Sequence, residues 1–264
     1  MTSGSRPAGV DRPGSSTVLR ETPLAGDVPR FEIPGWQERY GVLAGVTGRG
    51  PGAAGFDLGL WSTSPVGEVM TRWRLLRRVE PGFHATILAN QVHGTDVAWH
   101  RDGYGWNLLE GFDGHGTARP GLLLTVTIAD CVPVYLVDPE ARVIALLHAG
   151  WRGTAGRILA RGVEVMVAHG AVPDRVALHA GVGICGPCYE VGREVMEGCG
   201  VPAEGAGPWH LDLREVLTGQ ARALGLGSVT ASGWCSGHDA AHFFSHRRSR
   251  GNDGRMVAYL GILP

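Results

Sequence analysis

The sequence predicts an α/β fold of the α+β kind, a single domain of mixed β-sheets with flanking helices. Short runs of β-branched and other apolar residues recur along most of the chain, bounded by glycine and proline. Segments with apolar residues at helical spacing lie between some of these runs. Because the runs come in adjacent pairs as often as they alternate with helices, we expect mixed sheets rather than a doubly wound parallel sheet.

The order of the expected elements follows from these patterns. Residues 1–30 are rich in Ser, Gly, Pro and Arg and lack apolar periodicity, which predicts a flexible leader before one domain over residues 31–264. Strands are expected at residues 40–47, 85–89, 122–129, 134–137, 143–148, 176–180 and 256–262. Helices are expected at residues 65–78, 155–168, 190–197 and 213–224.

The composition excludes several classes of function. The 24 basic and 25 acidic residues nearly cancel, so no net positive field favours nucleic acid or an anionic membrane, and a small-molecule substrate is expected. The odd number of cysteines, 5, argues for reduced thiols over a disulfide framework. With neither a secretory signal nor a run of about 18 apolar residues, we expect a soluble, cytoplasmic protein.

Three potential metal ligands fall at the ends of apolar strands: His93, Cys131 and His148. Two imidazoles and one thiolate are good ligands for Zn²⁺, and three protein ligands leave the fourth tetrahedral position open, as in catalytic zinc sites. The gaps between the three residues match no compact zinc motif. From the residues alone, a His or Cys at the end of a strand is more often a buried core residue than a metal ligand.

The segments around these residues, however, resemble a known family. NQVHGTDV at residues 90–97, ADCVPVYLVD at 129–138 and HAGWRGT at 148–154 are similar to motifs of the YfiH-like family, also called the laccase-domain or polyphenol oxidase family. The resemblance extends to GPCYEVG at 186–192, to FFSHRRSRGNDGRM at 243–256 and, more loosely, to residues 44–60.

This resemblance implies an α/β protein whose zinc is held by His93, Cys131 and His148. It also implies purine nucleoside chemistry: phosphorolysis of adenosine, inosine or guanosine, cleavage of methylthioadenosine, and deamination of adenosine. Purine nucleosides and phosphate would then be the partners. Older naming of the family as a copper-dependent phenol oxidase keeps Cu²⁺ as the alternative metal.

Three residues are candidates for catalysis. Asp130, next to Cys131, is placed to shuttle a proton in deamination, although an Asp at such a junction often only accepts backbone hydrogen bonds. Arg152 lies in the turn expected to enter the helix at Ala155, where helix-start amides and the guanidinium would bind phosphate. Arg49 matches the arginine of the family's N-terminal segment, although its neighbours, Thr47 and Gly48, keep only part of that motif.

Substrate contacts are expected from Asn90 and Gln91, which open the NQVHG segment, and from Arg247 in the FFSHRR segment. In that segment His246 replaces the usual tyrosine of the family. We therefore expect the family role of this ring position to differ here.

Other patterns in the chain offer rival sites. Cys185 and Cys188 form a C-x-x-C that suits a redox pair or half of a zinc ribbon, but no second C-x-x-C exists, so we interpret the pair as structural. The spacing of His238 and His242 imitates the H-E-x-x-H motif of metalloproteases with Asp in place of Glu, in a segment of low helix propensity.

Rival functions share the residues of the zinc model. Cys131 with His148 as its base would suit a thiol hydrolase. Multicopper oxidases need many clustered histidines, and the chain has no H-x-H pair. A metal-containing nucleotide-binding protein without turnover is a further alternative. It would need Cys188 as a fourth ligand, because structural zinc sites are normally closed by four protein groups.

Overall fold

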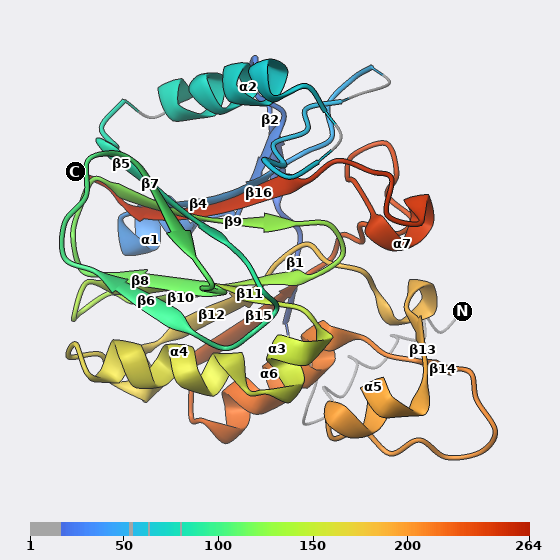
Figure 1. Cartoon of the computed structure of the whole chain (residues 1–264). Helices are drawn as coiled ribbons and strands as arrows, with labels where there is room; N and C mark the ends of the chain where they lie inside the picture. The colour runs from blue at the N-terminus through green and yellow to red at the C-terminus, as the bar shows by residue number, and fades with distance from the viewer. Residues whose placement is uncertain (1–16, 53–54, 63, 80) are drawn as a thin grey trace, which may run out of the picture.

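The computed structural model describes residues 17–264, except residues 53–54, 63 and 80. Two seven-stranded sheets pack face to face, and helices cover their outer faces (Figure 1). In spatial order, the first sheet contains β1 (Thr17–Leu19), β15 (Ser228–Ser232), β12 (Ala177–Ala180), β10 (Val132–Asp138), β11 (Val143–Ala149), β8 (Gly114–Thr117) and β6 (Val97–His100). The second contains β2 (Thr22–Leu24), β3 (Arg30–Glu32), β4 (Val42–Thr47), β16 (Met256–Ile262), β9 (Leu122–Ile128), β5 (Ala85–Asn90) and β7 (Gly105–Glu110).

The helices lie outside this sandwich. Helix α2 (Val66–Val79) covers the second sheet, while α4 (Ile158–Val167) and α6 (Leu213–Ala223) cover the first (Figure 1). The shorter elements are α1 (Trp36–Tyr40), α3 (Trp151–Ala155), α5 (Arg193–Gly198), α7 (His246–Ser249), the 3₁₀ turns Pro173–Arg175 and Gly186–Cys188, and a ribbon of β13 (Glu190–Val191) and β14 (Trp209–His210). Both large sheets mix parallel and antiparallel pairs, so the predicted fold class is confirmed.

The long central strands are buried on both faces, which explains their continuous apolar sequences. Every residue of β10, β11 and β16 is buried. One face of each sheet contacts the other sheet, where Val126 of β9 and Tyr135 of β10 share a cluster. The opposite face packs under helices, as Trp73 of α2 does in its own cluster. A sheet covered on both sides has no solvent face that would require alternating polar residues.

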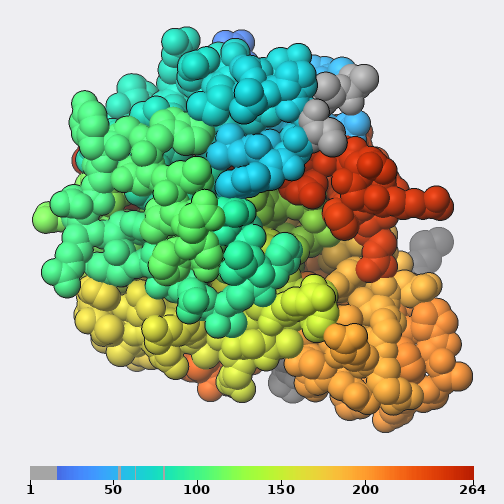
Figure 2. Space-filling view, in the orientation of Figure 1, coloured from blue at the N-terminus to red at the C-terminus, as the bar shows by residue number. Residues whose placement is uncertain are grey.

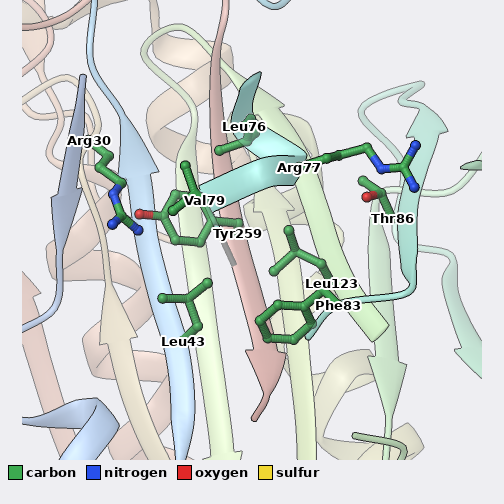
Figure 3. Close-up of a pocket in the computed structure, with 9 residues that line it drawn as sticks. All are labelled: Arg30, Leu43, Leu76, Arg77, Val79, Phe83, Thr86, Leu123 and Tyr259. Atoms are coloured by element: carbon green, nitrogen blue, oxygen red, sulfur yellow. The ribbon is translucent and has the colours of Figure 1, made fainter. Parts of the chain in front are cut away.

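A small internal cavity lies beneath α2, lined by Leu43, Leu76, Phe83, Leu123 and Tyr259 among others (Figure 3). Its volume is about 10 Å³, which accommodates at most a single water molecule. This cavity is therefore part of the hydrophobic core and is too small to bind a substrate.

The seven predicted strands are all present, most with ends shifted by one or two residues. The remaining strands were missed, including the six-residue β7 and the five-residue β15. The helix expected at 155–168 begins earlier, as α3 at Trp151; the chain then leaves helical geometry at Arg157, where φ is 65°, and resumes as α4. The segment 190–197 was expected to be wholly helical, but β13 forms its first two residues before α5 begins.

The leader predicted over residues 1–30 is wrong for its second half. Residues 1–16 lie outside the described residues. Residues 17–30, in contrast, contain β1 and β2, and β1 pairs with β15 at the edge of the first sheet. In each of these three-residue edge strands two residues are exposed and one is half-buried, so their sequences carry little apolar signal.

Candidate metal centre and active site

The three predicted metal ligands meet in one cluster and line a cavity together with residues of α3 and α7. These two helices lie at one end of the sandwich (Figure 1). His93 lies in the loop after β5 of the second sheet, and Cys131 lies between β9 and β10, where the chain crosses from one sheet to the other. His148 lies in β11 and pairs in register with Pro133 of β10. The packing of the two sheets thus brings together three residues that span 55 positions of the chain, from His93 to His148.

The donor atoms of these side chains are close enough to bind a single ion. One nitrogen or sulfur from each of His93, Cys131 and His148 lies within 4.8 Å of the others. The two imidazole rings are 4.9 Å apart and nearly perpendicular, at 76°. His148 is buried, Cys131 is half-buried and His93 is exposed, so the cluster is fixed on one side and open to solvent on the other.

The backbone around the cluster is unusual in two ways. His93 and Asp130 have φ values of 60° and 85°, a left-handed conformation that non-glycine residues seldom adopt. A Cβ atom on Gly150 would lie 3.0 Å from the Cys131 sulfur and 3.3 Å from Cδ2 of His93. Residues in a seldom-used backbone conformation and a glycine in a tight space thus lie next to the donor atoms, as is common at functional sites.

Asp113, which was not predicted from the sequence, orients the cluster. Its fully buried carboxylate accepts a hydrogen bond from Nδ1 of His148 at 2.9 Å and from the backbone amides of Val92, His93 and Gly94 at 2.7–3.1 Å. A carboxylate behind a ligating histidine fixes its tautomer and leaves Nε2 facing the metal position. A lone Asp in a glycine-rich segment carries no distinctive sequence signal.

The electrostatics of the cluster favour a charged thiolate. Burial raises the pKa of Cys131, but His148 and His93 outweigh it and lower the pKa to about 6. Burial lowers the pKa of His148, but the Cys131 sulfur and Asp113 outweigh it and raise the pKa to about 9. Burial likewise opposes ionisation of Asp113, yet its hydrogen bonds hold the pKa below the usual 3.8. A thiolate is the form in which cysteine binds metal.

The cluster opens into a cavity of about 510 Å³, a volume typical of small-molecule sites. Its mouth is the hollow between the red segment that contains α7 and the yellow-green segment of α3 (Figure 2). Besides the three ligands, its walls include the predicted residues Asn90, Gln91, Asp130, Arg152 and Arg247, and also Trp61, Trp151, Tyr189, His246 and Arg255.

Arg49 does not join this site. Arg49 is not one of the described residues that line the cavity. Its guanidinium forms an ion pair with Asp253 at 3.2 Å. Arg255, two residues further along, does line the cavity. The prediction for Arg49 relied on a partly matching motif, and the structure gives this residue an anchoring contact instead.

Asp130 lines the cavity, but both of its carboxylate oxygens already accept hydrogen bonds. Oδ1 accepts from the Ser236 hydroxyl and Oδ2 from the backbone amide of Arg247, both at 2.6 Å. The Arg247 side chain in turn donates to the Glu190 carbonyl and lies over the Tyr189 ring. These contacts make Asp130 a residue that positions Arg247.

The two amides of the NQVHG segment differ in what they contact. Gln91 is tied to Thr127 of β9 by three hydrogen bonds of 2.7–2.9 Å through both ends of its amide, and so it anchors the loop that contains His93. Asn90 donates to Glu110 at 3.0 Å from the cavity wall. Asn90 is therefore the better placed of the two to contact a substrate.

Arg152 has the least constrained charge in the cavity. Its guanidinium lies 4.4 Å from the centre of the Trp151 ring, and within the described part of the chain it has no hydrogen-bonding partner. The helix that contains it begins at Trp151 and has 5 residues. The predicted entry at Ala155 is thus corrected, and the side chain, more than helix-start amides, is available to bind an anion.

The rival sites are also resolved. His242 lies in turns outside any helix and contacts Phe31 and Trp234, so the H-D-x-x-H segment has no metalloprotease geometry. Cys188 is absent from the cluster of His93, Cys131 and His148. The arrangement of three ligands with an open position is therefore retained among the described residues.

Comparison with known proteins agrees with the motifs. Residues 44–263 match the family described as "Multi-copper polyphenol oxidoreductase laccase". The chain belongs to this laccase-domain family. It is 42% identical to the "Purine nucleoside phosphorylase" of Deinococcus radiodurans over 244 residues, which span 89% of this chain and 91% of that protein.

Two further matches bear on the fold and on the chemistry. The crystal structure of YlmD from Geobacillus stearothermophilus superposes with a TM-score of 0.83 and 29% identity, covering 92% of this laccase-domain chain and 100% of that one. A protein of an unknown prokaryotic organism named "Adenosine deaminase RL5" is 40% identical over 159 residues, which span 56% of this chain and 61% of that protein. In residues 17–264 as described, no helix is both long and apolar enough to cross a membrane.

Proposed function

We propose that this laccase-domain protein is a zinc-dependent purine nucleoside phosphorylase for adenosine, inosine, guanosine and methylthioadenosine, with adenosine deaminase activity. The observation that carries the proposal is the convergence on one cavity of a three-donor metal cluster and three arginines, Arg152, Arg247 and Arg255. The name of the Deinococcus relative supports the same activity.

The donor set suits zinc. Two imidazoles and a thiolate of lowered pKa match the ligands that Zn²⁺ prefers, and the carboxylate of Asp113 holds His148 in the tautomer that binds metal. A zinc ion bound there would supply a Lewis acid and lower the pKa of a coordinated water. The exposed position of His93 leaves this side of the cluster accessible from the cavity.

The arginines provide the positive charge that phosphorolysis requires. Phosphate must be held beside the sugar while positive charge develops at its C1′ atom. Arg152 is free to form charge-assisted hydrogen bonds with phosphate, whereas Arg247 is held in place by Asp130, Glu190 and Tyr189. Among the described residues that line the cavity, Asp130 is the one acidic side chain, and its oxygens are occupied by hydrogen bonds.

Product analysis tests this function. Zinc-loaded protein is incubated with adenosine with and without phosphate, and adenine, ribose 1-phosphate and inosine are separated by chromatography. Phosphate-dependent adenine, formed by the wild type and lost in Cys131→Ala, supports the proposal. Cys199→Ser is the matched control, because Cys199 is buried and belongs to neither metal-ligating group. Equal activity of wild type and Cys131→Ala would contradict the proposal.

Deamination is the second activity in the proposal, supported by the name of the RL5 relative and by the metal cluster beside the cavity. It predicts inosine from adenosine in the absence of phosphate. Metal analysis of the active protein decides between Zn²⁺ and Cu²⁺. Oxygen consumption with phenols, in protein that forms neither adenine nor inosine, would favour the copper oxidase. The five cysteines are free thiols, which supports the expected cytoplasmic location.

A further inference from the structure

A second group of metal-ligating side chains lies apart from the cluster of His93, Cys131 and His148. Cys185 and Cys188 form the C-x-x-C noted in the sequence, and the fold brings Cys235 and His238, a C-x-x-H, against it. One donor atom from each of these four residues lies within 4.8 Å of the others. A parallel bridge between Gly183 and Cys235 aligns the two segments. Two pairs of potential ligands, each with two residues between its members, therefore face each other.

Two separations within the group match the nitrogen–sulfur edge of a zinc tetrahedron. Nδ1 of His238 lies 3.4 Å from the Cys188 sulfur and 3.6 Å from the Cys185 sulfur. Bond lengths of about 2.3 Å to sulfur and about 2.0 Å to nitrogen, in tetrahedral geometry, require a nitrogen–sulfur edge of roughly 3.6 Å. The side chains thus leave a space of the size that the ion needs.

Backbone amides surround one sulfur of this group. The amides of Cys185 and Gly237 donate to the Cys235 sulfur at 3.2 and 3.3 Å. Gly237 is also required for the close approach, because a Cβ atom there would lie 2.8 Å from Cβ of Cys188. The Asp239 carboxylate accepts from the Cys235 amide at 2.8 Å and lies 3.7 Å from Nε2 of His238. A carboxylate on the far nitrogen of a ligating histidine is a common outer partner of zinc.

Other interpretations of the group account for fewer of its members. A disulfide would use two of the three sulfurs and leave the third sulfur and His238 without a role. A nucleophilic cysteine would need a substrate cavity, and among the described residues that line the large cavity none of these four is present. Four protein donors that converge and leave no open position are typical of a structural site.

We propose that Cys185, Cys188, Cys235 and His238 bind a second, structural Zn²⁺ ion that clamps two loops behind the active-site cavity. The first loop contributes Ile184 and Tyr189 to the cavity wall. The second contains Ser236, whose hydroxyl holds Asp130. The ion therefore fixes the wall that positions Arg247 without contacting a substrate.

Metal stoichiometry tests this proposal independently of enzyme activity. The chain of 264 residues, purified without chelators, is expected to contain two zinc ions. Cys131→Ala and His238→Ala are each expected to contain one, and Cys199→Ser is expected to retain both. His238→Cys, which restores four donors, is expected to recover the second ion. One zinc per wild-type chain, unchanged by His238→Ala, would overturn the proposal.

A spectroscopic measurement covers the case in which a His238 variant fails to fold. Zinc is replaced by cobalt in Cys131→Ala, which retains the four-ligand group intact. One equivalent of Co²⁺ is expected to give tetrahedral d–d bands and a thiolate charge-transfer absorption stronger than that of a site with one thiolate. An absent cobalt spectrum in the reduced protein, or a wild-type mass two hydrogens lower that indicates a disulfide, would contradict the proposal.

Discussion

The two groups of metal-ligating residues differ in origin and in exposure to the cavity. The first takes three donors from the ends of long strands in both sheets, and its open side faces a cavity of about 510 Å³. The second takes four donors from two short loops and has no open position. Under the two proposals, a group of three donors that opens into a cavity would serve catalysis, and a group of four donors without an open position would serve stability.

The comparison predicts the largest contrast when one ligand of each group is removed. His148→Ala is expected to lower kcat/KM by roughly 10³-fold or more, because a catalytic metal contributes several kcal/mol to the transition state. His238→Ala is expected to lower the melting temperature more and kcat/KM less. Activity assays and thermal unfolding, with zinc measured in each sample, check this. The reverse pattern would exchange the roles assigned to the two groups.

The cysteines of the two metal-ligating groups should differ in how fast they are alkylated at a given pH. Because the pKa of Cys131 is lowered to about 6, the metal-free protein retains its thiolate at pH 7 and loses it as the pH falls through 6. Burial and Cys235 raise the pKa of Cys185 to about 12, so that thiol stays protonated. At pH 7 Cys131 should be alkylated at least about 100-fold faster than Cys185. Peptide mass spectrometry after iodoacetamide treatment measures both rates.

Zinc provides the control for this measurement. Loading the protein should suppress alkylation of Cys131, since a metal-bound thiolate is no longer free to react. A thiol hydrolase would instead keep a reactive Cys131 in its active form. Persistence of both alkylation and activity in the zinc-loaded protein would favour that rival function.

Substitution of Asp113 tests how far zinc binding by His93, Cys131 and His148 depends on the buried carboxylate that orients His148. Asp113→Asn places an amide NH₂ against backbone N–H groups and weakens the orientation of His148. Zinc affinity should fall by about 10–100-fold. Chelator competition measures it, with Asp174→Asn, on the surface, as the matched control. Unchanged affinity would show that the sheet alone fixes the histidine.

Arg152 tests the anion site of the open cavity. Arg152→Gln should raise KM for phosphate by about tenfold, which corresponds to the loss of about one charged hydrogen bond. KM for the nucleoside should change less. Arg161→Gln is the control, because Arg161 is exposed on α4 and, among the described residues, forms an ion pair with Glu164 alone. Equal effects of the two variants would remove Arg152 from phosphate binding.

The smallest expected effect concerns Gly150. A methyl group there would crowd the Cys131 sulfur and the His93 ring, so Gly150→Ala should weaken zinc binding by a few-fold. Gly192→Ala is the control, since Gly192 also precedes a helix and a Cβ atom there would meet nothing within 4 Å. Equal zinc affinity in both variants would show that the cluster adjusts freely.

Parts of the site could be read from the sequence because they lie within single segments. The residues at 93, 131 and 148 each sit in a motif of their own, and Arg152 follows four positions after His148. Asp113 and Arg255 could not be found in this way, because their roles come from contacts with segments distant in the chain. Arg49 was assigned by motif, and tertiary packing paired it with Asp253.

The sequence by itself determined the long strands and helix α2, because burial on both faces of a strand or one face of a helix imposes a local apolar pattern. Only the tertiary structure decided which residues lie against the C-x-x-C of Cys185 and Cys188. Cys235 meets Cys185 across 50 residues, a pairing that depends on the bridge at Gly183 and on space at Gly237. Local pattern follows from burial, whereas the grouping of donors follows from how the sheets and loops pack.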